Sequence, residues 1–274
     1  MTDPLDRIAD ALERLAPPPA ASADPLKHPA YVWKSDVLVA TRAFVALPLE
    51  QLIGIDKQKA ALVGNLDRLA HGFAAHDVLL WGARGTGKSA LVKSAVADVQ
   101  EKGGDLALVE VGSASLDSLP ALFAAIAAIP RAFALFIDDL GFDAAGDARA
   151  LRSMLEGGAE ARPANARLLV TSNRRHLVPR DIAEQESAIN PRDAIDDQLA
   201  LADRFGLSLG FHVMDQDLYL AVVEGYAAAH DLPFDPAEAV GWATRRGSRS
   251  GRVAWHYIVD LAGRTGRSID RNAV

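Results

Sequence analysis

The first pattern along the chain is a series of short apolar runs, separated by segments with helical periodicity. The runs are VLLW (78–81), LALVEV (106–111), FALFI (133–137), RLLVT (167–171) and GLSLG (206–210). Segments between them, such as SALVKSAVADVQEKG, are long enough for helices. Strands and helices that alternate in this way are typical of a parallel sheet with helices on both faces. We therefore predict an α/β fold with a five-stranded parallel sheet sandwiched by helices.

The pattern changes towards the C-terminus. Residues 215–264 contain no comparable apolar run, and the stretches DQDLYLAVVEGYAAAH and RSGRVAWHYIVDLAG have helical periodicity. We therefore divide most of the chain into an α/β domain over residues 30–210 and a small all-α subdomain over residues 211–274.

The N-terminal segment has a third pattern. Charged residues separate apolar ones that recur at helical spacing, namely Leu5, Ile8, Leu12 and Leu15. This spacing predicts an amphipathic helix within residues 1–16. The stretch APPPAASADP follows and indicates a Pro/Ala linker over residues 17–29. Such a helix could dock on the body of the protein or on a protein partner.

Composition narrows the possible functions. The chain has 274 residues, half of them apolar, so a sizeable core can form. The absence of cysteine excludes disulfides, thiolate metal sites and thiol nucleophiles. Seven histidines without an H-x-x-x-H pair argue against zinc. A formal net charge of −7 argues against a generally basic nucleic-acid coat but leaves a local patch open.

Targeting signals are the next feature. The sequence has no window of about 18 uninterrupted apolar residues, the length that a membrane-spanning helix needs. Its first residues, MTDPLDRIADALERL, lack the basic start and apolar stretch of a signal peptide. We therefore expect a cytoplasmic protein without a membrane partner.

A phosphate-binding motif follows the first apolar run directly. The sequence GARGTGKS matches the pattern G-x-x-x-x-G-K-[ST] through Gly82, Gly87, Lys88 and Ser89. Glycines let backbone N–H groups turn inward around phosphate, and the following helix adds positive potential at its N-terminus. Lys88 would reach the β- and γ-phosphates, and the Ser89 hydroxyl would ligate Mg²⁺. A flexible Gly-rich turn, the alternative, needs neither residue.

Two adjacent aspartates end the strand ALFI about fifty residues downstream. A P-loop enzyme needs an acidic residue at the tip of a second strand for the Mg²⁺ shell, and Asp138 fits that role. Asp139 would then orient the attacking water, although aspartate is one methylene shorter than glutamate. Asp143, on the same loop, is a second candidate for this role. The alternative is that the two aspartates only solvate a strand end.

A third polar strand end comes from RLLVTSN. The neutral amide of Asn173 could hold the attacking water or read the γ-phosphate without adding charge. An Asx turn that leads into RRHLVPRD is an equally good local interpretation. Both alternatives stay open at this point.

These motifs together resemble the AAA+ P-loop ATPases. GARGTGKS, FIDD, TSN, DRFG (203–206) and SGRVA (250–254) occur in the order and approximate spacing of that class. A closer resemblance, over about residues 45–260, is to a bacterial AAA+ family known only as a domain of unknown function (number 815). That resemblance is carried by LIGIDKQK, WGARGTGKSALVK, TSNRRHLVPRD, LADRFGLSLGF and RRGSRSGRVA.

The resemblance implies further roles. Asn173 would be the first sensor, and Arg204 the arginine finger that is inserted into the nucleotide pocket of a neighbouring subunit. Arg252 would be the second sensor, on a lid, with Arg249 as its rival. The alternative for Arg204 is a helix C-terminal arginine that the helix dipole favours. The nucleotide-binding residues expected on this basis are Ile53, Gly54, Gly82, Ala83, Arg84, Gly85, Thr86, Gly87, Lys88, Ser89, Leu91 and Arg252.

The sequence departs from the family pattern in one respect. The family resemblance would place a glutamate at or soon after the two adjacent acids, and here Asp139 and Asp143 occur instead. RRGSRSGR and the arginines at 174, 175 and 180 could contact a polyanion, but no aromatic ladder for stacking bases accompanies them. Nucleic acid is therefore a possible partner that the sequence does not favour.

The expected function is that of an ATP-binding AAA+ protein that hydrolyses ATP with Mg²⁺. It would change conformation within a homo-oligomer, a ring or a filament, acting on an unidentified partner. A nucleotide-gated DNA loader or adaptor with weak hydrolysis is the first alternative. The second is an inert P-loop scaffold that serves a partner through the N-terminal helix.

Overall fold

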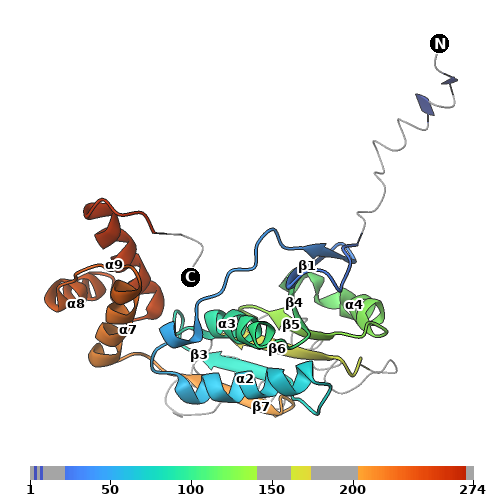
Figure 1. Cartoon of the computed structure of the whole chain (residues 1–274), viewed down its shortest axis with the longest axis horizontal. Coiled ribbons are helices and arrows are strands. Elements are labelled where there is room, and N and C mark those ends of the chain that lie inside the picture. The colour runs from blue at the N-terminus through green and yellow to red at the C-terminus, as the bar shows by residue number, and fades with distance from the viewer. Residues whose placement is uncertain (1–2, 5–6, 9–21, 141–161, 174–202, 270–274) are drawn as a thin grey trace, which may run out of the picture.

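The computed structural model describes residues 3–4, 7–8, 22–140, 162–173 and 203–269. A seven-stranded sheet with its helices forms one part of the molecule, and three C-terminal helices lie beside it (Figure 1). The amphipathic pattern over residues 1–16 and the first half of the linker lie almost entirely outside the described residues. Within the described chain, no helix is both long and apolar enough to cross a membrane.

The sheet confirms the predicted α/β fold. Five parallel strands correspond to the five apolar runs: β3 (Val78–Gly82), β4 (Leu106–Val111), β5 (Ala132–Ile137), β6 (Ala166–Ser172) and β7 (Leu207–Phe211). They lie in the order β4-β5-β6-β3-β7, with every neighbouring pair parallel. The connections therefore cross over, as they must in a sheet whose parallel strands are joined through helices.

Two additional strands bring the sheet to seven. β1 (Ala30–Lys34) pairs in parallel with β4, and β2 (Val37–Ala40) pairs antiparallel with β1 at the edge of the sheet. Lys34 lies opposite Val37, so the hairpin loop has only two residues, Ser35 and Asp36, with φ of 51° and 60°. Left-handed φ at both loop positions matches the twist of a tight hairpin. We predicted five strands because this turn lacks the usual glycine.

Helices cover both faces of the sheet. One face packs against α2 (Asp56–Ala70) and α3 (Lys88–Glu101), and the other against η2 (Ser113–Ser118) and α4 (Leu119–Ile126). Within β3, Leu80 belongs to the first core and Leu79 to the second, since successive side chains of a strand point to opposite faces. Burial on both faces explains why the strands are uninterrupted apolar runs.

The C-terminal helices are α7 (Gln216–Ala229), α8 (Pro236–Arg245) and α9 (Gly251–Arg264). Each begins at a side chain that accepts a backbone N–H hydrogen bond: Asp215, Asp235 and Ser250. Such caps satisfy N–H groups that the first helical turn leaves without partners. Tyr226 of α7 and Trp255 of α9 meet edge to face, with ring centroids 5.4 Å apart.

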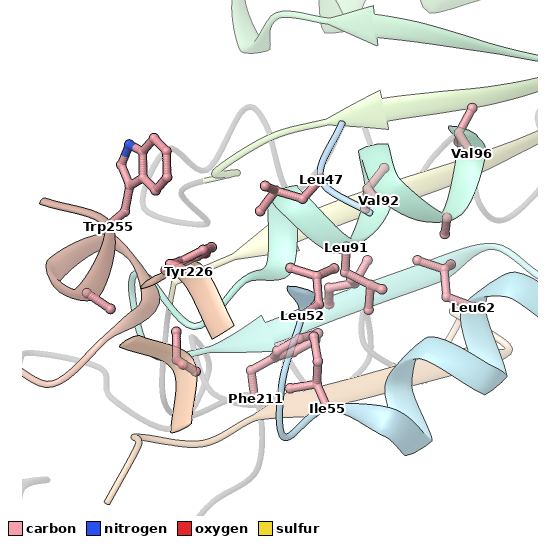
Figure 2. Close-up of a cluster of buried hydrophobic side chains, with 14 of the residues drawn as sticks. Leu47, Leu52, Ile55, Leu62, Leu91, Val92, Val96, Phe211, Tyr226 and Trp255 are labelled. Atoms are coloured by element: carbon pink, nitrogen blue, oxygen red, sulfur yellow. The ribbon is translucent and has the colours of Figure 1, made fainter. Parts of the chain in front are cut away.

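The three helices α7, α8 and α9 are called the lid below. Their hydrophobic core is continuous with the first core of the α/β domain. Figure 2 shows Tyr226 and Trp255 on one side and Leu91 on the other, with Leu52 in the segment between them. Leu52 and Ile55 lie between the short helix η1 (Leu49–Gln51) and α2 and are buried. The chain before α2 therefore packs against both parts of the molecule and holds the lid beside the end of β3.

Candidate nucleotide-binding site

The loop between β3 and α3 takes a conformation that depends on glycine. Gly82, Gly85 and Gly87 have φ of 131°, 72° and 94°, values that residues with a side chain rarely adopt. A Cβ on Gly82 would also lie 2.0 Å from the Phe211 carbonyl oxygen of β7. The Thr86 hydroxyl donates to the Ala83 carbonyl at 2.8 Å and closes the turn. The loop thus delivers Lys88 and Ser89 to the first turn of α3.

Lys88 is buried beneath this loop, with 5 % of its surface exposed. Its ammonium group donates to the carbonyls of Gly82 at 3.0 Å and Ala83 at 2.7 Å, and to Asn173 Oδ1 at 2.9 Å. Burial lowers the pKa of Lys88 to about 8, against the opposing attraction of Asp139 and Asp138. The charged amine is therefore poorly compensated, and an anion beside it would favour its protonated form.

Ser89 and Asp138 lie together. The Ser89 hydroxyl donates to Asp138 Oδ1 at 2.6 Å, and the Thr171 hydroxyl of β6 donates to the same oxygen, also at 2.6 Å. The serine oxygen keeps lone pairs, and Asp138 Oδ2 accepts no hydrogen bond from any described residue. These hard oxygen atoms are the ligand type that Mg²⁺ prefers.

Asp139 follows in a left-handed conformation with φ of 51°. Its backbone N–H donates to Thr171 Oγ1 at 2.8 Å. The Asn173 amide donates to Asp139 Oδ1, and Arg84 Nη2 contacts Oδ2 at 3.3 Å. Asn173 therefore bridges Lys88 and Asp139, although the three side chains come from three separate segments of the chain.

Lys88, Ser89, Asp138, Asp139 and Asn173 all line one cleft of about 770 Å³, a volume within the usual range for small-molecule sites. Its polar end holds the loop from Arg84 to Ser89 with Asp138, Asp139 and Asn173. Its apolar end combines the segment before α2 with the lid, through Leu52, Ile53, Ile55, Met214, Val222, Tyr226, Trp255 and Val259. A polar region thus adjoins an apolar region within one cleft.

The lid contributes one charged edge of the cleft. Arg252 and His256, one turn apart on α9, line it, whereas Arg249 does not. Burial and the charges of Arg246 and Arg252 lower the pKa of His256. The geometry therefore favours Arg252 over Arg249 as the cation that faces a bound phosphate.

Other predicted residues lie behind the cleft. Leu91 is fully buried in the core, and Gly54 packs against Leu218 of α7, which a Cβ at Gly54 would approach to 2.3 Å. Gly82 and Ala83 contribute the carbonyls that hold Lys88. Residue 143 and the arginines at 174, 175 and 180 lie outside the described residues.

Arg204 lies away from this cleft. It precedes β7 and lines a second cleft of about 470 Å³, together with residues that precede β3 and β6, among them Asp77 and Arg162. These are the amino ends of parallel strands, whereas the nucleotide cleft lies at their carboxyl ends. Arg204 therefore cannot reach the cleft of its own chain, and contact with a phosphate would need a neighbouring copy.

Sequence reasoning missed several residues of the cleft, among them Thr171, Trp255 and His256. Thr171 was part of the quoted TSN motif, but nothing in the sequence tells that its hydroxyl contacts both aspartates. Trp255 and His256 follow Arg252 at i+3 and i+4 on α9 and share its helix face. That spacing was a usable signal for the lid side of the cleft.

The fold and the position of the cleft are those of the AAA+ P-loop fold class. The sequence matches the family described as "Protein of unknown function (DUF815)" over residues 26–265, and the chain belongs to this family. No functionally curated protein matches the sequence.

Solved structures support the fold. The Aeropyrum pernix ORC2 protein aligns with 16 % identity and a TM-score of 0.55, covering 85 % of this chain and 68 % of its own. The Thermotoga maritima RuvB Holliday junction branch migration motor aligns with 17 % identity and a TM-score of 0.50, covering 80 % of this chain and 66 % of its own. The chain thus spans about two thirds of the length of these structures, and the likeness shows the fold.

Proposed function

We propose that this protein binds ATP with Mg²⁺ and hydrolyses it to drive a conformational change in a homo-oligomer. The observation that carries the proposal is the convergence of the phosphate loop, the Asp138–Asp139 strand end and Asn173 on one cleft that the lid also lines. A structural Gly-rich turn would need neither a buried lysine beneath it nor two polar strand ends beside it.

The residues present fit both proposed ligands. The apolar end of the cleft, with Ile53, Tyr226 and Trp255, suits adenine, and the loop glycines leave backbone N–H groups for phosphates. No cluster of three or more His, Cys, Asp or Glu exists among the described residues. Mg²⁺ in P-loop sites uses one or two protein ligands, water and the phosphates themselves, and Ser89 and Asp138 would provide the protein ligands.

Each side chain has a proposed task. Lys88 turns from the loop carbonyls to the β- and γ-phosphates, and Ser89 and Asp138 hold the metal shell. Bound Mg²⁺ would neutralise charge on the phosphate oxygens. Asp139 and Asn173, already hydrogen-bonded to each other, orient the attacking water. Arg252 couples lid closure to the γ-phosphate.

Arg204 is proposed to act on the nucleotide of a neighbouring subunit. It lies near the amino ends of the parallel strands, whereas the cleft of its own chain lies at their carboxyl ends. Mixing Arg204→Ala protein into wild type at constant total concentration should reduce turnover by more than simple dilution, since each defective subunit also disables its neighbour. Arg267→Ala, which removes an exposed arginine of the C-terminal region, is the matched control. Mixing this variant into wild type should leave turnover unchanged. Loss in strict proportion to the mutant fraction would contradict action in trans.

The test of the function itself is a steady-state ATPase measurement over a range of protein concentrations, with Mg²⁺ and with EDTA. Specific activity should rise with protein concentration, because the site is completed by a neighbour, and it should vanish in EDTA. The absence of turnover at every concentration would refute hydrolysis and favour the scaffold alternative.

One observation favours a second candidate, a nucleotide-gated DNA loader. Between Glu238 and Asp260 the chain has no acidic residue, and four arginines lie there: Arg245, Arg246, Arg249 and Arg252. None of them forms an ion pair within the described chain, and Arg246 instead lies over the Trp242 ring at 4.7 Å. The stretch between Glu238 and Asp260 therefore carries four arginines without a carboxylate partner in the described chain.

This candidate predicts that DNA stimulates the ATPase and that salt suppresses the stimulation, because phosphate contacts release counterions. A double change, Arg245→Ala with Arg249→Ala, should remove the stimulation and leave the basal rate intact. Neither residue lines the nucleotide cleft. An ATPase rate that does not respond to single- or double-stranded DNA at low salt would exclude the loader.

A further inference from the structure

Thr171 of β6 connects the two aspartates at the end of β5. Its side chain is buried, with 1 % of the residue exposed. The hydroxyl donates to Asp138 Oδ1 at 2.6 Å and accepts the Asp139 backbone N–H at 2.8 Å. A further hydrogen bond, from the Leu140 N–H to the Thr171 carbonyl at 2.9 Å, ties the same turn to β6. Thr171 thus forms hydrogen bonds with three successive residues at the end of β5, namely Asp138, Asp139 and Leu140.

These contacts determine how Asp138 presents its carboxylate. Oδ1 accepts two hydroxyl hydrogen bonds, from Ser89 and Thr171, and lies at the end of the phosphate loop. Oδ2 accepts none within the described chain, and Asp138 lines the cleft. A carboxylate held through one oxygen leaves the other available for a metal ion or a metal-bound water. Without Thr171, the serine that is the proposed metal ligand would be the only group among the described residues that orients the Asp138 carboxylate.

The same hydroxyl stabilises an unfavourable backbone conformation. Asp139 has φ of 51°, which costs free energy for a residue other than glycine and persists only where its surroundings enforce it. The hydrogen bond from its N–H to a buried acceptor supplies such a restraint. This backbone conformation directs the Asp139 side chain towards Arg84 and Asn173.

We infer that Thr171 is a positioning residue that holds the metal-side and water-side carboxylates in one fixed arrangement through a single hydroxyl. This rests on the proposed function, because it assigns Thr171 to the same Mg²⁺–nucleotide site. Thr171 itself would touch neither nucleotide nor metal. It acts through Asp138 and Asp139, in the way that hydrogen-bonded partners orient ligands in other metal sites.

Calorimetric titration of ADP, with Mg²⁺ and with EDTA, tests this without any need for turnover. In EDTA, wild type and Thr171→Val should bind the nucleotide equally, because the phosphate loop is unchanged. Mg²⁺ should raise the affinity of wild type, and about 10- to 100-fold of that gain should be missing in Thr171→Val. Thr171→Ser, which restores the hydroxyl, should recover most of it, and Thr171→Ala should behave as the valine variant does.

Ser172→Ala is the matched control. Ser172 is the next residue of β6 and fully buried, and its hydroxyl has no hydrogen-bond partner in the described chain. Its removal should leave both titrations unchanged. A full Mg²⁺-dependent gain in Thr171→Val would overturn the inference alone, as would a serine variant as defective as valine. A wild-type affinity that does not respond to Mg²⁺ would overturn the proposed metal site and this inference together.

Discussion

Replacement of Lys88 by alanine is expected to abolish nucleotide binding, with a loss of affinity of at least about 100-fold, or about 2.7 kcal/mol. Lys88 is the buried cation beneath the phosphate loop, and its ammonium is held only by neutral oxygen atoms. Phosphates that enter the cleft would provide the opposite charge that this amine lacks. Isothermal titration calorimetry with ATP and Mg²⁺ measures the change directly.

The fold should survive this substitution, because Lys88 itself lines the open cleft and water can enter the space that its side chain leaves. Thermal unfolding followed by circular dichroism checks this point. Lys102→Ala is the control, since Lys102 is an exposed lysine at the other end of the same helix region, paired with Asp98. Retained affinity in a folded Lys88→Ala protein would mean that the cleft does not bind triphosphates through this loop.

Much of the fold could be predicted because the central strands are buried on both faces. FALFI and VLLW have no polar position, so each is predicted to be a strand whatever its exact first residue is. β2, the antiparallel partner of β1, lacked this signal, because an edge strand is only partly covered: Val39 of β2 is 39 % exposed. Their turn was equally hard to recognise, since Ser35 and Asp36 adopt left-handed conformations without glycine.

The candidate site was predictable to the extent that its parts are contiguous in sequence. GARGTGKS carries its chemistry within eight residues, so composition and order suffice to recognise it. The contacts of Asp139 with Arg84 and Asn173 link positions that are 55 and 34 residues apart. Such contacts depend on which strands are neighbours in the sheet, and β6 lies between β5 and β3 although β3 precedes both in sequence.

Backbone conformation was the other quantity that the residue types did not reveal. Aspartate tolerates left-handed φ better than most residues, but nothing adjacent to Asp139 requires it. The requirement comes from Thr171 on another strand. Because the turn positions the carboxylate, the distance argument that aspartate is one methylene shorter than glutamate is incomplete without the backbone geometry.

Replacement of Asp139 by asparagine is therefore expected to leave nucleotide binding intact and to reduce turnover by about 100-fold or more, the usual contribution of a general base. Asparagine is the appropriate substitute because it is isosteric and also tolerates left-handed φ. Alanine should have the same effect on turnover but adds backbone strain at φ of 51°. Calorimetric ATP binding and single-turnover hydrolysis separate the two effects.

The length of the acid can be tested at the same position. Asp139→Glu keeps the carboxylate and should retain turnover well above that of Asp139→Asn, provided that the carboxylate and not the backbone turn determines the rate. The control is Asp105→Asn, which removes an exposed carboxylate that pairs with Arg131 at the other end of the sheet. Wild-type turnover in Asp139→Asn would show that this residue is not the base, and Asp143, the second candidate from the sequence, would then be tested in the same way.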